Sequence, residues 1–228
     1  MEIKVVIFDL DGVLTNTSEY HYRGWKRLAD ELGVPFDRKR NEALRGVSRR
    51  RSLELMLDGH PATEGQMLEW MARKNDYYVE LIQQMTPADI LSGALELLME
   101  VRQTDIKIGI GSASKNTHTV LDRLHLTNCI DAISDGHSVE RHKPAPDLFL
   151  HCAEQLSVDP NEAIVVEDAA SGVEAALAGD FWVIGLGPEE RVGAAHVVYP
   201  SLEGIHLEDI LKAVGRAAEQ AERNKERV

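Results

Sequence analysis

The chain has 228 residues, of which 43% are hydrophobic and 28% are charged, so it is long enough for one large domain or for a core with a smaller lobe. Its formal net charge is −13, from 25 Lys and Arg against 38 Asp and Glu. Nucleic acids and anionic membranes are bound through basic surfaces, so this acidic balance argues against both as partners.

Short apolar runs alternate with helical patterns over most of the chain. We expect strands at residues 5–8, 106–111, 132–134, 163–167, 182–186 and 197–199. We expect helices at about 93–102, 116–124, 146–155, 171–178 and 207–222. This alternation indicates an α/β fold, with a doubly wound parallel-sheet (Rossmann-like) core and helices on both faces of the sheet.

Residues 17–86 interrupt this alternation, because they show helical periodicity and no convincing strand. The apolar residues that share a helix face early in this block are Trp25, Leu28, Ala29 and Leu32. We therefore predict an inserted α-helical cap domain of residues 17–86, and a core domain built from residues 1–16 and 87–228. The connections at 14–17 and 86–92 would then form a hinge. The alternative is that these helices pack on the sheet as part of a single domain.

Two carboxylates follow the first predicted strand. Asp9 and Asp11 stand two residues apart on the turn that leads into Gly12. Ligands bind at the carboxyl edge of a parallel sheet, and carboxylates are costly to desolvate there unless a cation or a reaction uses them. Asp9 is suited to attack phosphorus and form an aspartyl-phosphate, and Asp11 to give a proton to the leaving oxygen. The alternative is a solvated loop with two incidental acids.

A second acidic pair, Glu167 and Asp168, stands at the end of the strand predicted at 163–167. If this strand neighbours the first, both carboxylates meet Asp9 around one cation. Magnesium is the natural partner, because it is a hard ion that binds a few carboxylates while phosphate oxygens complete its shell. The alternative is that one of the two acids caps the helix that starts near Ser171.

Two further segments are suited to bind phosphate. Ser112 stands at the turn between the second predicted strand and the next helix, where a hydroxyl and exposed amides bind phosphate oxygens well. Lys143 precedes Pro144 in a stiff turn, from which it could neutralise both a phosphate and Asp9. The alternatives are a Ser/Asn helix cap in the first segment and a solvated lysine in the second.

These four segments, in this order, resemble the haloacid dehalogenase superfamily of phosphotransferases over nearly the whole chain. The resemblance implies that Asp9 is the nucleophile and Asp11 the acid/base, and that Ser112 and Lys143 bind the transferring phosphoryl group. It also implies Mg²⁺ as the cofactor. The residues assigned to the metal are Asp9, Asp11, Glu167 and Asp168.

The predicted cap domain and the loops that would face it resemble the β-phosphoglucomutase family within that superfamily. The resemblance rests on residues 17–21, 44–49, 73–76, 112–116 and 143–147. It implies interconversion of β-D-glucose 1-phosphate and D-glucose 6-phosphate through an aspartyl-phosphate enzyme and β-glucose 1,6-bisphosphate. The residues expected to bind this substrate are Thr17, His21, Gly46, Val47, Ser48, Arg49, Lys74, Ser112, Ala113, Ser114, Lys115, Asn116 and Lys143.

A mutase must also hold a second phosphate, one that is not transferred, at a distance from Asp9. Arg49 in the predicted cap domain is suited to a bidentate clamp on that phosphate. Lys74 and His21 are suited to bind sugar hydroxyls or to help close the lobe, although a lone His21 would otherwise indicate a packed helix residue.

Two other functions stay open at this point. A phosphatase of the same fold would let water, rather than a sugar hydroxyl, attack the phosphorylated Asp9. A non-catalytic phosphosugar-binding protein is disfavoured, since binding alone does not require a nucleophile.

The remaining expectations concern partners and location. We expect a small-molecule sugar phosphate as the ligand, no nucleic acid or membrane partner, and a monomer. Cys129 and Cys152 lack metal-type spacing, so we interpret them as two small buried apolar residues. The sequence shows neither an apolar stretch of membrane-spanning length nor a secretory leader, which predicts a cytoplasmic protein.

Overall fold

The computed structural model describes residues 2–44 and 47–225 of the chain. Its centre is a six-stranded sheet in which all neighbouring strands run parallel. The strands are β1 (Val5–Phe8), β2 (Lys107–Gly111), β3 (Ala132–Ser134), β4 (Ala163–Glu167), β5 (Trp182–Leu186) and β6 (Val197–Tyr199). Their order is β3-β2-β1-β4-β5-β6, which places β1 between β2 and β4. The parallel sheet confirms the predicted α/β fold.

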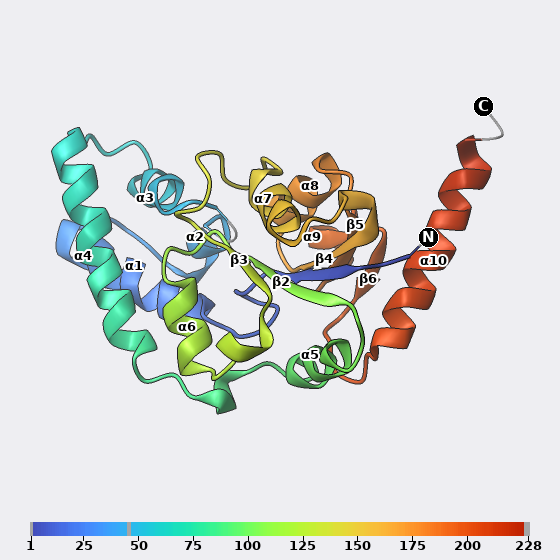
Figure 1. Cartoon of the computed structure of the whole chain (residues 1–228). Coiled ribbons are helices and arrows are strands. Elements are labelled where there is room, and N and C mark those ends of the chain that lie inside the picture. Colours follow the sequence, from blue (N-terminus) through green and yellow to red (C-terminus); the bar gives the residue numbers. More distant parts are fainter. Residues whose placement is uncertain (1, 45–46, 226–228) are drawn as a thin grey trace.

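Helices cover both faces of this sheet (Figure 1). The helices on one face are α5 (Ala94–Arg102), α6 (Thr117–Arg123) and α10 (Leu207–Lys225). Those on the other face are α7 (Asp147–Leu156), α8 (Ala170–Ala178) and α9 (Glu189–Val192). Among the described residues, no helix is both long enough and apolar enough to cross a membrane.

The central strand shows why the sheet needs two helical layers. Val6 and Phe8 of β1 pack into the apolar cluster on the α5 side, whereas Val5 and Ile7 pack into the cluster on the α7 side. Successive side chains of a strand point to opposite faces, and all four of these residues are at most 1% exposed. A continuous apolar run is stable only between two such layers, which is why this run predicts a buried parallel strand.

The first four helices after β1 lie together at one end of the molecule (Figure 1). They are α1 (Ser18–Leu32), α2 (Arg38–Glu42), α3 (Arg49–Leu57) and α4 (Glu64–Ile82), and we call them the helical lobe. Its apolar cluster includes Trp25, Leu53 and Met56, and is separate from the two clusters on the sheet. The ends of α1 and α4 nearest the core differ, because Tyr78 and Ile82 of α4 belong to the cluster on the α5 side and Tyr20 of α1 packs against it. The separate cluster favours the two-lobe interpretation, and the boundaries at residues 16/17 and 86/87 stay a prediction.

The structure also contains short elements that the sequence pattern does not predict. Helix α9 has four residues, too few to display a helical period. The single-turn 3₁₀ helices are η1 (Pro87–Asp89), η2 (Thr127–Cys129) and η3 (Pro160–Glu162). Strand β2 begins at Lys107 rather than at residue 106, because Lys107 is the first residue in register with Val5 of β1.

Burial predicts different reactivity for the two cysteines. Cys152 is fully buried on α7, and burial raises the pKa of its thiol to about 12, whereas Cys129 is partly exposed. Iodoacetamide at pH 8 should therefore modify Cys129 in the native protein and modify Cys152 only after unfolding in urea. Mass spectrometry of peptides from the two samples measures this, and equal native labelling of both cysteines would contradict the packing of α7.

Candidate active site

The two acidic pairs meet because their strands are neighbours. β1 pairs with β4 so that Phe8 lies opposite Val166, and the residues that follow leave the same edge of the sheet. The backbone N–H of Asp9 donates to the carbonyl of Val166 at 2.9 Å. Carboxylate oxygens of Asp9, Glu167 and Asp168 lie within 4.8 Å of one another, and all three residues are buried.

A buried lysine lies between two of these carboxylates. Lys143 Nζ donates to Asp9 Oδ1 at 2.6 Å and to Glu167 Oε2 at 2.7 Å, and the Lys143 side chain is 1% exposed. Burial alone would lower the pKa of Lys143, but the two carboxylates raise it above its usual value, so the lysine is charged. Buried charges persist only where they are paired, and Lys143 therefore fixes the orientation of Asp9.

Two glycines make room for the carboxylates. A Cβ on Gly172 would overlap the carboxylate of Glu167, and a Cβ on Gly12 would overlap that of Asp168. Gly12 also has a φ of +93°, a conformation that favours glycine. Glu167 Oε1 accepts the backbone N–H groups of Asp168 and Ala169 at 3.0 and 2.9 Å. Both oxygens of Glu167 are therefore held by hydrogen bonds.

This cluster suits a divalent metal ion. Three buried carboxylates and one lysine leave an excess of negative charge, and the ligand atoms that converge are all oxygens. A hard cation prefers such donors and would neutralise the excess. Within the described part of the chain, the carboxylate of Asp11 is not a member of this group, so its role as a metal ligand stays a prediction.

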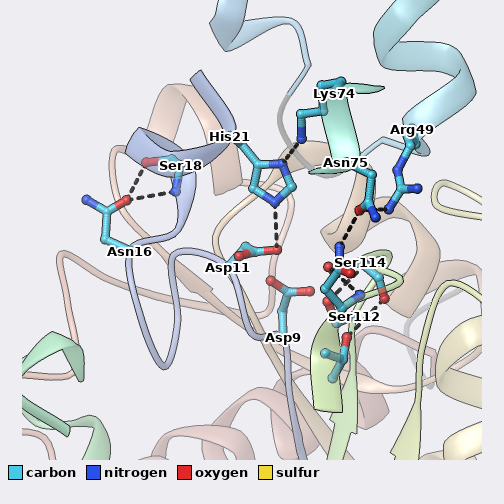
Figure 2. A network of polar contacts seen from close by, with 12 residues as sticks. Asp9, Asp11, Asn16, Ser18, His21, Arg49, Lys74, Asn75, Ser112 and Ser114 are labelled. Carbon is cyan, nitrogen blue, oxygen red and sulfur yellow. Dashed lines mark hydrogen bonds and ion pairs between the residues drawn. The ribbon is translucent and has the colours of Figure 1, made fainter. Parts of the chain in front are cut away.

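Asp11 lies beside His21 of α1, and His21 in turn contacts Lys74 of α4 (Figure 2). Asp11 Oδ2 is 4.0 Å from His21 Nε2, and His21 Nδ1 is 2.8 Å from Lys74 Nζ. Asp11 Oδ1 is buried and has no hydrogen-bond partner among the described residues. Burial, with the carboxylates of Asp9 and Asp168, raises the pKa of Asp11 to about 7. Such a carboxyl group is suited to general acid/base catalysis near neutral pH.

His21, which is half-buried, and Lys74, which is buried, form a pair with lowered pKa values. Burial is the main cause for both residues, and the charge of Arg49 lowers both pKa values further. A neutral His21 that accepts a hydrogen bond from Lys74 at Nδ1 carries its proton on Nε2, the atom that faces Asp11. The imidazole also stacks on the ring of Tyr78, with 4.1 Å between the ring centroids. The pair therefore holds an N–H group toward Asp11.

The loop after β2 is shaped by its own serines. Ser112 is 1% exposed, and its Oγ accepts the N–H of Ser114 at 3.2 Å. Ser114 Oγ accepts the N–H of Asn116 at 3.1 Å. These hydroxyl-to-backbone turns fix the loop, and α6 begins directly after it at Thr117. Asn116 holds the N-cap position of α6, but its side chain does not cap the helix and bonds to Asn75 instead.

Arg49 stands at the start of α3 and points to the junction of the lobe with the core (Figure 2). Ser48 caps this helix by accepting the N–H of Arg51 at 3.3 Å. Arg49 Nη2 donates to Asn75 Oδ1 at 2.7 Å, and Asn116 Nδ2 of the core donates to the same oxygen at 2.8 Å. Three separate elements thus meet at one amide oxygen.

One cavity of about 700 Å³ is lined by both the core and the helical lobe, a size typical of small-molecule sites. The predicted site residues that line it are Asp9, Asp11, His21, Val47, Ser48, Arg49, Lys74, Ala113, Ser114, Lys115 and Asp168. The predicted residues that do not line it are Thr17, Ser112, Asn116, Lys143 and Glu167. Gly46 lies outside the described residues. Most of the predicted site residues thus converge on one cavity. Lys143 bonds to Asp9 of its lining, and Glu167 bonds to Lys143.

Some cavity residues are missed by the sequence argument. Trp25 lies four residues after His21 on α1, and Met71 lies three residues before Lys74 on α4. These spacings place each pair on one helix face, so helical periodicity counted from His21 and Lys74 could have found them. His142 carries no such signal, because the path of the loop before α7 brings it to the cavity.

Residues 3–180 match the family model of the haloacid dehalogenase-like hydrolases, and the chain belongs to this family. It is 39% identical over 210 residues to the β-phosphoglucomutase of Bacillus subtilis (strain 168), an alignment that covers 90% of this chain and 93% of that protein. A crystal structure of β-phosphoglucomutase from Clostridium difficile has a TM-score of 0.91 to this chain at 38% identity, and covers 94% of this chain and 98% of that one. The validoxylamine A 7'-phosphate phosphatase of Streptomyces hygroscopicus subsp. limoneus is 30% identical over 185 residues, or 80% of this chain and 85% of that protein.

The ion pairs of Lys143 predict a linkage between this residue and metal binding. Lys143→Met should lower the free energy of unfolding in EDTA by about 3 kcal/mol, because Asp9 and Glu167 lose the cation between them. A divalent metal ion should restore part of the loss, so Mg²⁺ should stabilise the variant more than the parent protein. Urea unfolding with and without Mg²⁺ measures both effects. Lys4→Met, which removes an exposed lysine, is the control, and equal metal dependence in the three proteins would contradict the prediction.

Proposed function

We propose that the chain interconverts β-D-glucose 1-phosphate and D-glucose 6-phosphate. The observation that carries this proposal is the single cavity that joins Asp9 and Asp11 of the core to Arg49, Lys74 and His21 of the helical lobe. A reactive carboxylate pair and a separate set of phosphate- and sugar-binding groups thus face one space. The β-phosphoglucomutases of Bacillus subtilis and Clostridium difficile, which align with 90% and 94% of this chain, support the same reaction.

In the proposed reaction, Asp9 carries the phosphoryl group. Lys143 holds Asp9 Oδ1, which leaves Oδ2 to attack phosphorus. The bond between phosphorus and the leaving sugar oxygen breaks, and an aspartyl-phosphate forms. Lys143 also reduces the repulsion between the anionic substrate and the carboxylates, and Ser112 is the proposed donor to the transferring phosphoryl oxygens.

Asp11 moves the proton. In its protonated form it donates to the leaving sugar oxygen, and as a carboxylate it takes a proton from the sugar hydroxyl that attacks phosphorylated Asp9. Its raised pKa of about 7 suits both roles at neutral pH. The unpartnered Asp11 Oδ1 is available to substrate, while His21 faces Oδ2.

The transferring and resting phosphates exchange places during the proposed cycle. The intermediate, β-glucose 1,6-bisphosphate, must turn round so that its other phosphate meets Asp9. A second site must therefore hold whichever phosphate is not being transferred. Arg49, Ser114, Lys115 and Asn116 are the proposed residues of this site, which we call the distal phosphate site.

A magnesium ion belongs to the proposal, with Asp9, Glu167 and Asp168 as the residues that would hold it. When bound, it would neutralise negative charge on the transferring phosphoryl group. We also propose that the active form is a monomer.

Hydrolysis of a sugar phosphate is the second candidate function. The similarity to the Streptomyces phosphatase favours it, because the same Asp9, Asp11 and Lys143 would also serve hydrolysis. The two reactions differ in whether water or a sugar hydroxyl reaches phosphorylated Asp9.

The nucleophile predicts the outcome of a coupled assay. Asp9→Asn should lower formation of D-glucose 6-phosphate from β-D-glucose 1-phosphate, Mg²⁺ and a trace of the bisphosphate by about 10⁴-fold or more, since an amide forms no acyl-phosphate of this kind. Coupling to glucose 6-phosphate dehydrogenase, with free phosphate measured in parallel, separates mutase from phosphatase turnover. Retention of substantial activity by the variant would refute the nucleophile, and free phosphate as the main product of the parent protein would refute the mutase.

If Arg49 binds the distal phosphate, its loss should affect only substrates that fill the distal phosphate site. Arg49→Ala should lower kcat/KM for β-D-glucose 1-phosphate by about 100-fold, which corresponds to roughly 3 kcal/mol of lost charge-assisted hydrogen bonding. Hydrolysis of acetyl phosphate, which has no second phosphate, should change far less. Arg51→Ala is the matched control, because Arg51 is an exposed arginine on the same helix. An equal loss with both substrates would count against a distal phosphate site at Arg49.

A further inference from the structure

The strongest unassigned feature next to the cavity is the side chain of Asn75 on α4. Its Oδ1 accepts one hydrogen bond from Arg49 Nη2 at 2.7 Å and another from Asn116 Nδ2 at 2.8 Å. Arg49 belongs to α3 of the helical lobe, and Asn116 follows β2 in the core. A single neutral oxygen therefore joins two proposed phosphate-binding residues that come from different parts of the fold (Figure 2).

Asn75 lies behind the surface that a ligand would touch. Arg49 lines the cavity, whereas Asn75 does not. The bond to Asn75 occupies one of the five N–H groups of the guanidinium, so the others stay available to a ligand. Asn116 does not line the cavity either, but it follows Ser114 and Lys115, which do, and it has a second amide hydrogen beyond the one that it donates to Asn75. Asn75 is therefore placed to orient both donors without occupying the space of the phosphate.

Because the acceptor on Asn75 is an uncharged amide oxygen, it does not neutralise the positive charge of Arg49. Among the described residues, no carboxylate forms an ion pair with Arg49, although the guanidinium is partly buried. A carboxylate at position 75 would accept the same two hydrogen bonds, but it would also neutralise Arg49 and repel an incoming phosphate. An amide oxygen orients the cation and leaves its charge for the ligand. The other arginines near the start of α3 differ, because Arg50 and Arg51 pair with glutamates.

We propose that Asn75 is a positioning residue that aligns Arg49 and Asn116 for the distal phosphate, and that it thereby favours substrates with a phosphate in that site. This inference rests on the proposed function. The competing interpretation is that the bridge only fastens the helical lobe to the core. A fastening role affects every substrate alike, whereas a positioning role affects only ligands that fill the distal phosphate site.

Kinetics on two substrates separate these roles. Asn75→Ala should raise KM for β-D-glucose 1-phosphate by about tenfold, the effect of one or two hydrogen bonds that no longer orient a charged group. Mg²⁺-dependent hydrolysis of acetyl phosphate, which has no distal phosphate, should change less than twofold. Asn75→Asp retains the oxygen that accepts both hydrogen bonds. It should impair the mutase reaction more than Asn75→Ala does, because it adds a negative charge next to Arg49. Gln83→Ala, which removes an exposed amide directly after α4, should leave both reactions unchanged.

The pattern across these variants decides the inference. Equal losses with both substrates would assign Asn75 a fastening role and overturn the proposal. An Asn75→Asp variant as active as the parent protein would also overturn it, since charge at position 75 would then have no effect on the phosphate.

A binding measurement separates failure of this inference from failure of the proposed function. In an Asp9→Asn background, which prevents turnover, calorimetry should give a Kd for β-glucose 1,6-bisphosphate that is about tenfold weaker when Asn75→Ala is added. If the parent protein does not isomerise the sugar phosphate but this weakening is observed, the proposed function is wrong and the role of Asn75 stands. If the parent protein isomerises its substrate and Asn75→Ala weakens neither KM nor Kd, the role of Asn75 is wrong and the function stands.

Discussion

The ammonium group of Lys143, buried between Asp9 and Glu167, is the interaction on which the rest of the site depends. Several carboxylates packed at the edge of a sheet would repel one another and lose their hydration. The ammonium group of Lys143 offsets part of this cost. Three parts of the chain bring the charges together: β1 ends directly before Asp9, β4 ends at Glu167, and the loop before α7 carries Lys143. The remaining negative charge suits the cluster to a divalent cation.

The cavity has positively charged groups at its wall, although the chain as a whole is negatively charged. A protein with a formal net charge of −13 repels phosphate esters at long range, so their binding depends on local positive charge. Lys143, Arg49 and Lys115 supply this charge at or directly behind the cavity wall. The core contributes the lysine that contacts the reactive carboxylate, and the helical lobe contributes the arginine. This arrangement is the basis of the proposed division, in which the core transfers the phosphoryl group and the helical lobe recognises the substrate.

This division also explains why mutases and phosphatases are both found among the relatives of the chain. In the proposed mechanism, the acidic cluster with Asp9 and Lys143 would serve any transfer of a phosphoryl group through an aspartate. The outcome would then depend on the groups that hold the acceptor and exclude water, and the cavity residues of the helical lobe proposed for this task lie on α1, α3 and α4. The contact of Asn75 with Arg49 and Asn116 belongs to this second set, because it links the lobe to the loop after β2.

The sequence by itself determined the parallel sheet and the residues at its reactive edge. Continuous apolar runs mark strands buried on both faces, and a carboxylate directly after such a run, as at Asp9 and Glu167, must lie at the carboxyl edge. Only the tertiary structure decided which polar side chains touch. Asn75 lies in the segment 73–76 that carries part of the family resemblance, but its position in α4 predicts a helix face and not a partner. Its bonds to Arg49 and Asn116 arise because α3, α4 and the loop after β2 pack against one another, and hydrogen bonds between residues distant in sequence depend on that packing to within a few tenths of an ångström.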